Sequence, residues 1–269
     1  MIERIALDTL FGVARPIVGM VHLHSLPGAP AWAGSMNAVL DAALADAAAL
    51  TAAGVHGMIV ENYGDVPFFK GRVPPETIAA MTVAVDHVRR ASAVPIGINV
   101  LRNDAAAALA IVAATGAAFI RVNVHTGAVL ADQGWIEGRA HETLRSRRRL
   151  GLRCAILADV AVKHAFMPPG SDIRSAARDA WRRGRADALI VSGPATGLPT
   201  GPDRILAVRE AVTDARIWIG SGLDEHNIGS LLPLVDGAIV GSALCHGGTA
   251  GRGIDPDRAQ RLLSIASRT

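Results

Sequence analysis

Ile219-Gly220-Ser221-Gly222-Leu223 and Val240-Gly241-Ser242-Ala243-Leu244 are two similar turns near the C-terminus. Each follows a short apolar run that is typical of a buried strand, and the first also precedes a helical stretch. The loops after the seventh and eighth strands of a (β/α)8 barrel use such turns to present backbone N–H groups to a phosphate. The two turns therefore predict a barrel with a phosphate site, although tight strand-to-helix turns also use glycine for backbone reasons alone.

Eight short apolar runs alternate with helical segments along the chain. The runs are continuously apolar, as strands buried on both faces should be. The chain has 269 residues, half of them hydrophobic, which suits one barrel of about 250 residues. We therefore expect a single (β/α)8 domain over residues 1–269, with strands within residues 17–21, 58–60, 96–100, 119–122, 154–158, 188–191, 217–219 and 238–240.

Helix start and stop signals separate these runs. The stretch before the first strand, up to Arg15, is expected to close the bottom of the barrel. Four later helices carry signals of their own, which predict a helix over residues 38–53 that stops at Gly54, one opened by Pro74-Pro75, one capped by Asn103 or Asp104, and a last one opened by Asp255-Pro256.

The composition argues against nucleic acid and membrane as partners. Lys and Arg total 27 against 24 Asp and Glu, and aromatic residues make up 4% of the chain. The one basic cluster, within residues 145–153, lies at the end of an expected helix and is typical of a solvated helix face. Apolar runs fall short of the roughly eighteen residues that a membrane span needs, and Cys154 and Cys245 are too few for a disulfide framework. We expect a cytoplasmic homo-oligomer.

Polar residues follow the first six expected strands, on the face where barrel enzymes keep their chemistry. A polar residue at a strand end is often only a helix cap or a hydrogen-bonding partner at the barrel edge. Six strands that end in this way together favour a functional site. The candidates, in strand order, are His22 and His24; Glu61 and Asn62; Asn99 and Arg102; Arg121 and Asn123; Asp159 and Lys163; and Ser192, Gly193, Thr196 and Gly197.

These segments resemble the BtpA family, which takes its name from photosystem I biogenesis. The resemblance covers nearly the whole chain and implies a barrel of the phosphate-binding kind. It implies much less about chemistry, because many members resemble sugar-metabolism proteins of bacteria that do not photosynthesise. The motifs that carry it are His22-Leu23 with Leu26-Pro27-Gly28, Val60-Glu61-Asn62-Tyr63-Gly64-Asp65-Val66-Pro67-Phe68, Asn99-Val100-Leu101-Arg102-Asn103-Asp104, Phe119-Ile120-Arg121-Val122-Asn123, Asp159-Val160-Ala161-Val162-Lys163-His164 and Val191-Ser192-Gly193.

Asp159 and Lys163 are the main acid and base candidates, with Glu61 as a partner carboxylate. A carboxylate at a strand end and an amine one turn further on can shift each other's pKa, which would hold a base near neutrality or prepare a lysine for a Schiff base. The alternative is a structural ion pair. Arg121 could bind a substrate anion or pair with Glu61 inside the barrel.

His22-Leu23-His24 raises a different possibility. Residues i and i+2 of a strand share a face, so both imidazoles could bind one divalent metal, as in metal-dependent hydrolase barrels. Against this, the eighth strand ends in Gly241-Ser242, where those hydrolases usually place a catalytic Asp. No cofactor is otherwise indicated.

The sequence thus favours an isomerase, epimerase or lyase that acts on a phosphorylated sugar or nucleoside-like small molecule. Two other classes stay open: the metal-dependent hydrolase, and a non-enzymatic assembly factor for membrane protein complexes, which the family name suggests. No exposed hydrophobic segment in the sequence favours the assembly factor. The expected substrate-binding residues are Ser192, Gly193, Thr196, Gly197, Gly220, Ser221, Gly222, Gly241 and Ser242 for the phosphate, and Asn62, Asn99, Arg102, Arg121 and Asn123 for the rest of the molecule.

Overall fold

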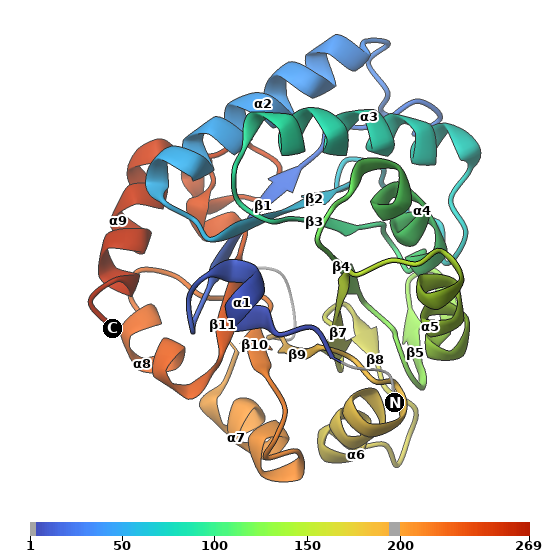
Figure 1. Ribbon diagram of the computed structural model, residues 1–269, viewed down its shortest axis with the longest axis vertical. Coiled ribbons are helices and arrows are strands. Elements are labelled where there is room, and N and C mark those ends of the chain that lie inside the picture. Colours follow the sequence, from blue (N-terminus) through green and yellow to red (C-terminus); the bar gives the residue numbers. More distant parts are fainter. Residues whose placement is uncertain (1–3, 194–199) are drawn as a thin grey trace.

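Eight parallel strands form the centre of the protein and close into a barrel, as the eight apolar runs predict (Figure 1). The structure is a computed structural model that describes residues 4–193 and 200–269. One face of each strand points into the barrel and the other packs under helices, which is why the strands are buried on both faces. In barrel order the strands are β1 (Ile17–His22), β11 (Gly237–Val240), β10 (Ile217–Ile219), β9 (Ala188–Val191), β7 (Ala155–Val160), β4 (Phe119–Val122), β3 (Ile96–Asn99) and β2 (Gly57–Glu61).

The short helix α1 (Leu7–Phe11) lies across the N-terminal end of the barrel, as expected for the stretch before the first strand (Figure 1). Phe11 packs against Phe119 of β4 and Trp218 of β10, with ring centroids 5.4 and 5.3 Å apart. These rings belong to an apolar core inside the barrel. The core fills the N-terminal end of the barrel. The polar groups that face inward are therefore gathered at the C-terminal end.

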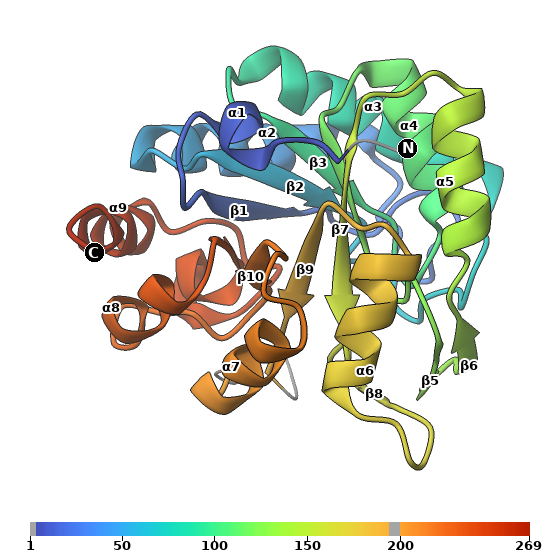
Figure 2. The ribbon, with the colours of Figure 1, turned by 60° about the horizontal axis from the view of Figure 1, so that its bottom comes forward.

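The remaining helices cover the outside of the strands (Figures 1 and 2). The predicted signals are confirmed: Gly54 follows α2 in a left-handed conformation, the Asp104 side chain caps α4, and α3 and α9 open at prolines. The helices are α2 (Met36–Ala53), α3 (Pro75–Ala91), α4 (Ala105–Thr115), α5 (Ala140–Arg149), α6 (Ile173–Arg178) with a π turn over Asp179–Arg183, α7 (Pro202–Ala211), α8 (Ile228–Leu231) with a 3-10 turn over Leu232–Leu234, and α9 (Pro256–Ala266), with further 3-10 turns at Ser242–Leu244 and His246–Gly248.

By length and composition, α2 alone among the described helices could cross a membrane. Its buried residues are Val39, Ala43, Ala47 and Leu50, which recur every three or four positions. This spacing gives a helix one packing face, and α2 contacts β1, α3 and α9. The helix is therefore part of the outer layer of the barrel.

The basic cluster of α5 is not wholly a solvated face. Arg145, Arg148 and Arg149 are exposed, as expected. Arg147 is buried instead, and its Nη1 lies 2.9 Å from Oδ2 of the buried Asp187. The expectation is wrong for Arg147 because a distant carboxylate, which the local sequence does not reveal, draws its side chain inward.

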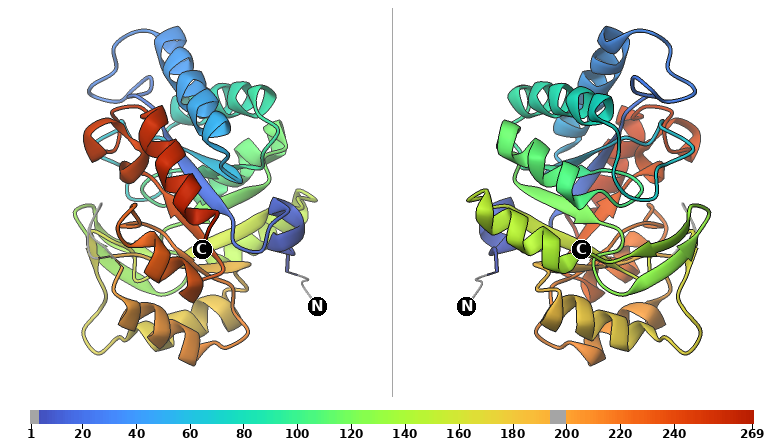
Figure 3. Two further views of the ribbon diagram at one scale, coloured as in Figure 1. Left: turned by 90° about the vertical axis from the view of Figure 1, so that its left-hand side faces the viewer. Right: turned by 90° about the vertical axis from the view of Figure 1, so that its right-hand side faces the viewer.

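A small antiparallel sheet, which the sequence pattern did not predict, stands beside the C-terminal end of the barrel (Figures 2 and 3). It consists of β5 (Ala128–Ala131) between β6 (Gly134–Glu137) and β8 (Ala165–Phe166). Val129 and Ile136 on its inner face pack against Val124 and Val162. The sheet is thus held to the loops that follow β4 and β7.

The outer face of this sheet exposes three large apolar side chains. Leu130 lies opposite Trp135 in one strand pair and opposite Phe166 in the other, and the three are 43, 49 and 78% exposed. We call Leu130, Trp135 and Phe166 the apolar row. The expectation that no hydrophobic segment would be exposed is therefore wrong, because the row is assembled from separate strands by pairing.

Candidate functional site

A layer of polar residues lies above the apolar core, at the C-terminal ends of the strands. Side chains alternate along a strand, so the inward rows that begin with core residues such as Ile59 and Phe119 continue to Glu61 and Arg121. The layer brings together residues that are far apart in the sequence: His22 of β1, Glu61 of β2, Asn99 of β3, Arg121 of β4, Asp159 of β7, and Ser192, which follows β9.

Asp159 is held at the centre of this layer by Arg121. Nε and Nη2 of Arg121 donate hydrogen bonds of 2.9 Å to Oδ2 and Oδ1 of Asp159, and the two side chains are 3 and 0% exposed. Asn123 Nδ2 adds a hydrogen bond of 3.0 Å to Oδ2. Burial acts to lower the pKa of Arg121, but the charge and hydrogen bonds of Asp159 outweigh it and raise that pKa.

The ion pair differs from both arrangements that the sequence suggested. Asp159 pairs with Arg121 and not with Lys163, and Arg121 does not pair with Glu61. The reason is strand order: β4 is hydrogen-bonded to β7, which carries Asp159, whereas Glu61 stands on β2 beyond β3. Neighbouring strands in a barrel follow the sequence, so this order could have indicated the pair.

Glu61 is fixed through one of its two carboxylate oxygens. Its Oε2 accepts a hydrogen bond of 2.6 Å from Asn99 Nδ2, which lies opposite in the β2–β3 register. Oε1 accepts no hydrogen bond from the residues that the structure describes. A carboxylate with one oxygen bound and one available is suited to accept a proton from a ligand.

Lys163 lies beyond the end of β7, in an irregular segment where Ala161 and His164 have φ values of 55° and 57°. Arg102 Nη2 donates a hydrogen bond of 2.7 Å to the Lys163 carbonyl and so holds this segment. Burial lowers the pKa of Lys163 and the Arg121 charge adds to the effect, while Glu61 and Asp159 oppose it. Within the described part of the chain, the Lys163 amine has no hydrogen-bond partner.

His22 also belongs to the polar layer. Its ring lies 4.6 Å from that of Tyr63, centroid to centroid. Burial lowers the pKa of His22, with Glu61 opposing and Lys163 adding to the shift, so we expect a neutral imidazole at pH 7. Tyr63, the single tyrosine of the chain, was missed by the sequence reasoning, although it stands inside the motif Glu61-Asn62-Tyr63.

The predicted metal site is not formed by His22 and His24. β1 ends at His22, so the strand alternation does not extend to His24, which is exposed in the following loop and acts electrostatically on Asp46 of α2. No group of three or more His, Cys, Asp or Glu side chains suited to a metal occurs in residues 4–193 and 200–269. The hydrolase reading therefore lacks its ligand set in the described residues.

The two glycine turns border the same polar layer. A Cβ at Gly220 would lie 2.6 Å from Ser192 Oγ and 3.4 Å from Arg121 Nη2, so only glycine fits there. Gly222 has φ of 75°, and the Ser221 hydroxyl between them is buried and has no partner in the part of the chain that the structure describes. The second turn runs from Gly241, close to the His22 ring, into the 3-10 turn Ser242–Leu244.

Three predicted ligand-binding residues are considered separately, namely Asn62, Thr196 and Gly197. Asn62 is buried and its amide is occupied within the protein, by the backbone N–H of Leu101 and the carboxylate of Asp65. It holds the loop after β2, and its expected role in substrate binding stays a prediction. Thr196 and Gly197 lie outside the described residues.

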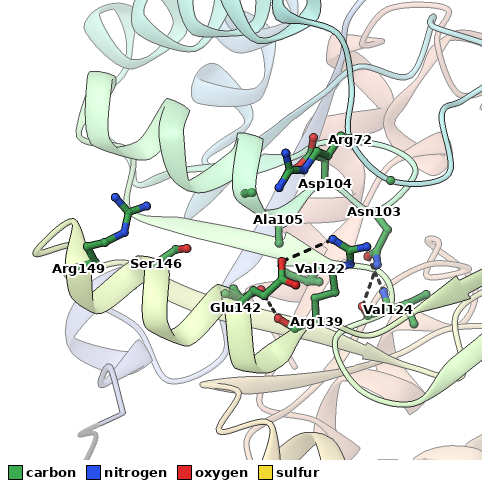
Figure 4. Close-up of a pocket in the computed structure, with 13 residues that line it drawn as sticks. Arg72, Asn103, Asp104, Ala105, Val122, Val124, Arg139, Glu142, Ser146 and Arg149 are labelled. Carbon is green, nitrogen blue, oxygen red and sulfur yellow. Dashed lines mark hydrogen bonds and ion pairs between the residues drawn. The ribbon is translucent and has the colours of Figure 1, made fainter.

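A pocket of about 320 Å³ also lies outside the barrel, between α4 and α5 (Figure 4). Two of its polar side chains have partners in the protein: Arg139 lies 3.5 Å from Glu142, and Asn103 forms hydrogen bonds with the backbone of Val124. The pocket supplies exposed arginines that serve below as controls.

Comparison with known proteins decides the family. The BtpA family model matches residues 13–268. The chain belongs to the BtpA family. It is 47% identical over 253 residues to the photosystem I biogenesis protein BtpA of Synechocystis, covering 94% of this chain and 88% of that protein. It is also 34% identical over 272 residues to a mitochondrial protein of Caenorhabditis elegans, covering 98 and 97% of the two chains.

Solved structures share the fold of this BtpA family member at low sequence identity. Tryptophan synthase from M. tuberculosis superposes with a TM-score of 0.62 at 18% identity, over 98% of this chain and 99% of that one. Phosphoribosyl anthranilate isomerase from Thermus thermophilus gives 0.59 at 12% identity, over 94 and 98%. At such identities the likeness establishes the barrel and leaves the reaction open.

We expect Asp159→Asn to lower the free energy of unfolding by about 3 kcal/mol, because it leaves the buried Arg121 charge without its counterion. Glu142→Gln is the matched control, since it removes a carboxylate from the exposed Arg139–Glu142 pair and should cost about 1 kcal/mol or less. Urea unfolding followed by circular dichroism measures both. Equal effects of the two variants would contradict the assignment of Asp159 to a buried pair.

A second prediction concerns Lys163, one of only two lysines in the chain. In a Lys70→Arg variant labelled by reductive 13C-methylation, the Lys163 signal should titrate at lower pH in the folded protein than in urea, because burial and Arg121 disfavour the charged amine. Glu61→Gln should lower the Lys163 pKa further, since Glu61 opposes the shift. A folded-state midpoint equal to or above the unfolded one contradicts the prediction.

Proposed function

We propose that the protein is an enzyme that isomerises, epimerises or cleaves a phosphorylated sugar or nucleoside-like small molecule. One observation carries the proposal: a carboxylate oxygen of the buried Glu61 and the amine of the half-buried Lys163 have no partners among the described residues. Charged groups placed in a barrel interior cost stability. Groups kept there without partners are typical of a reaction site.

The two groups suit proton transfer at carbon. Glu61 Oε1 can accept a proton next to a carbonyl group, and Lys163 in its charged form can donate one to the carbonyl oxygen. In its neutral form, which the lowered pKa favours, Lys163 can attack the carbonyl carbon and form a Schiff base with loss of water. Either route leads to isomerisation or to cleavage of a neighbouring carbon–carbon bond.

Asp159 takes a different role from the one expected for it. Both of its oxygens are bound to Arg121, so it is a positioning residue that keeps Arg121 in place. Nη1 of Arg121 makes no hydrogen bond with the described residues and is left for a ligand oxygen. Acid and base roles therefore fall to Glu61 and Lys163.

The phosphate is assigned to the turns after β10 and β11. The unpartnered Ser221 hydroxyl and the left-handed Gly222 lie in the first turn, and the 3-10 turn that opens at Ser242 forms the second. Gly220 lies close to Arg121 and Gly241 to the His22 ring, which supports a phosphate site at the edge of the polar layer that includes Glu61. Two structural neighbours, phosphoribosyl anthranilate isomerase and thiamine phosphate pyrophosphorylase, are also named for phosphorylated compounds.

An assembly factor is the second candidate, and the apolar row favours it. Leu130, Trp135 and Phe166 give a contiguous exposed patch of the kind that binds a partner, and the Synechocystis relative is named for photosystem I biogenesis. The relative in Caenorhabditis elegans, an animal without photosystems, shows that the family cannot serve photosystems alone. We therefore place the small-molecule function first.

Phosphate binding can be tested by thermal shift with sugar phosphates and nucleoside monophosphates, each beside its dephosphorylated counterpart. A bound ligand raises the melting temperature, so only the phosphorylated member of a true pair should do so. Ser221→Asp and Ser242→Asp should weaken binding about tenfold or more by placing like charges together. Ser230→Asp on α8, where the serine is exposed, is the control. If no phosphorylated compound exceeds its counterpart, the assembly factor becomes the better candidate.

Turnover of a compound found in that screen tests the acid–base roles. Glu61→Gln keeps the shape and removes the base, so the rate should fall by roughly 10²–10⁴-fold with the melting temperature retained. Glu142→Gln should leave the rate unchanged. If the Schiff-base route operates, borohydride with substrate should modify Lys163 and spare Lys70, which mass spectrometry can show. Full activity of Glu61→Gln would refute the role of Glu61.

A further inference from the structure

A second binding feature lies at the mouth of the barrel, where it joins motif residues such as Arg102 to Arg204, which no motif contained. It is a pocket of about 840 Å³ between the loops after β2, β3 and β7 and the start of α7. The described residues that carry the argument are Phe68, Arg102, Asp132, Phe166, Met167 and Arg204.

Two arginines of this pocket have unpaired N–H groups. Nε of Arg102 and Nε of Arg204 are both buried and have no hydrogen-bond partner among residues 4–193 and 200–269. Arg102 is only 6% exposed, and its Nη2 is already fixed on the Lys163 carbonyl, so its guanidinium cannot turn freely to find water. A buried donor without an acceptor costs about 1–3 kcal/mol. Both arginines line the same pocket, so an oxyanion bound there can accept hydrogen bonds from their guanidinium groups.

The charge of the lining fits an anion. Among the described lining residues the single carboxylate is Asp132, which is exposed and accepts a hydrogen bond from Gln133. His164 also lines the pocket. Arg102 and Arg204 together therefore outweigh Asp132, and the arginine fork matches the planar oxygens of a carboxylate or the face of a phosphate.

The walls around the arginines are apolar. Phe68 comes from the loop after β2, and Phe166 with Met167 from the segment after β7. Phe166 is 78% exposed, an unfavourable position for a phenyl ring unless something covers it. Aromatic walls beside a positive charge are typical of sites for small molecules that join an apolar body to an anionic group.

We propose that this pocket binds an oxyanion carried on an aromatic or other apolar body. The inference deepens the proposed function and rests on it in one respect: together with the phosphate turns across the barrel mouth, the pocket makes the substrate a phosphorylated molecule with a second anionic group. The pocket adjoins the segment that carries Lys163, because Val162 and His164 line it and Arg102 holds the Lys163 carbonyl.

The test uses small probes with the full-length protein. Benzoate and phenyl phosphate carry an oxyanion on a ring, benzyl alcohol is the neutral match, and inorganic phosphate lacks the ring. Saturation-transfer NMR titrations should show benzoate or phenyl phosphate binding at least about tenfold more tightly than benzyl alcohol, since a charge-assisted arginine contact is lost in the alcohol. Comparison of the two anions shows whether the pocket prefers carboxylate or phosphate.

Variants locate the binding. Arg204→Gln and Arg102→Gln should each weaken the preferred probe about tenfold, and Phe166→Ala should weaken both anionic probes. Arg139→Gln, in the pocket between α4 and α5, should change nothing. Arg204 is only partly buried, so its variant remains informative if Arg102→Gln fails to fold. The proposal is overturned if no probe binds, if benzyl alcohol binds as well as benzoate and phenyl phosphate, or if Arg204→Gln and Phe166→Ala leave affinity unchanged.

The phosphate turns and the arginine pocket can be refuted independently of each other. Sugar-phosphate binding should respond to Ser221→Asp and not to Arg204→Gln, whereas benzoate binding should respond to Arg204→Gln and not to Ser221→Asp. Loss of sugar-phosphate binding in the parent protein with retained benzoate binding refutes the phosphate turns alone. The opposite result refutes the arginine pocket alone.

Discussion

The buried ion pair between Arg121 and Asp159 determines the arrangement of the whole polar layer. Neither side chain reaches solvent to any extent, so each requires the other to avoid an uncompensated charge in the barrel interior. Asn123 and Ser192 hydrogen-bond to Asp159, and Gly220 leaves room beside the guanidinium. The pair thus ties β4, β7, β9 and β10 together at one level. Glu61 and Lys163 interact electrostatically with this ion pair, but neither of them forms a salt bridge with Arg121 or Asp159.

The barrel could be predicted from the sequence because strands buried on both faces must be apolar without interruption. The small sheet could not. Its strands have two to four residues, and Leu130 and Trp135 are apolar on the solvent side, which removes the alternation that marks a half-buried strand. β8 is a strand only because Ala165 and Phe166 pair with β5, which is distant in the sequence. Such pairing depends on the tertiary structure and leaves no local sequence pattern.

The site was predictable as a set of positions and much less as a set of contacts. The strand ends Glu61, Arg121 and Asp159 follow from parallel strands whose ends meet on one face. The expected approach of Lys163 to Asp159 assumed a regular turn after the strand, but left-handed residues on both sides of Lys163 redirect the chain. No motif contained Arg204, which stands on α7, and only the fold brings it to the same pocket as Arg102.

Phe166 belongs to two surfaces at once, since it ends the apolar row and also lines the arginine pocket. A protein that covered the row would bury this ring from one side, and a small molecule in the pocket would bury it from the other. Two binding events that share a side chain are thermodynamically linked, and the linkage is reciprocal. A small molecule bound in the pocket would then change the affinity of the outer sheet for a partner protein. Enzyme and assembly factor would be compatible functions of this chain.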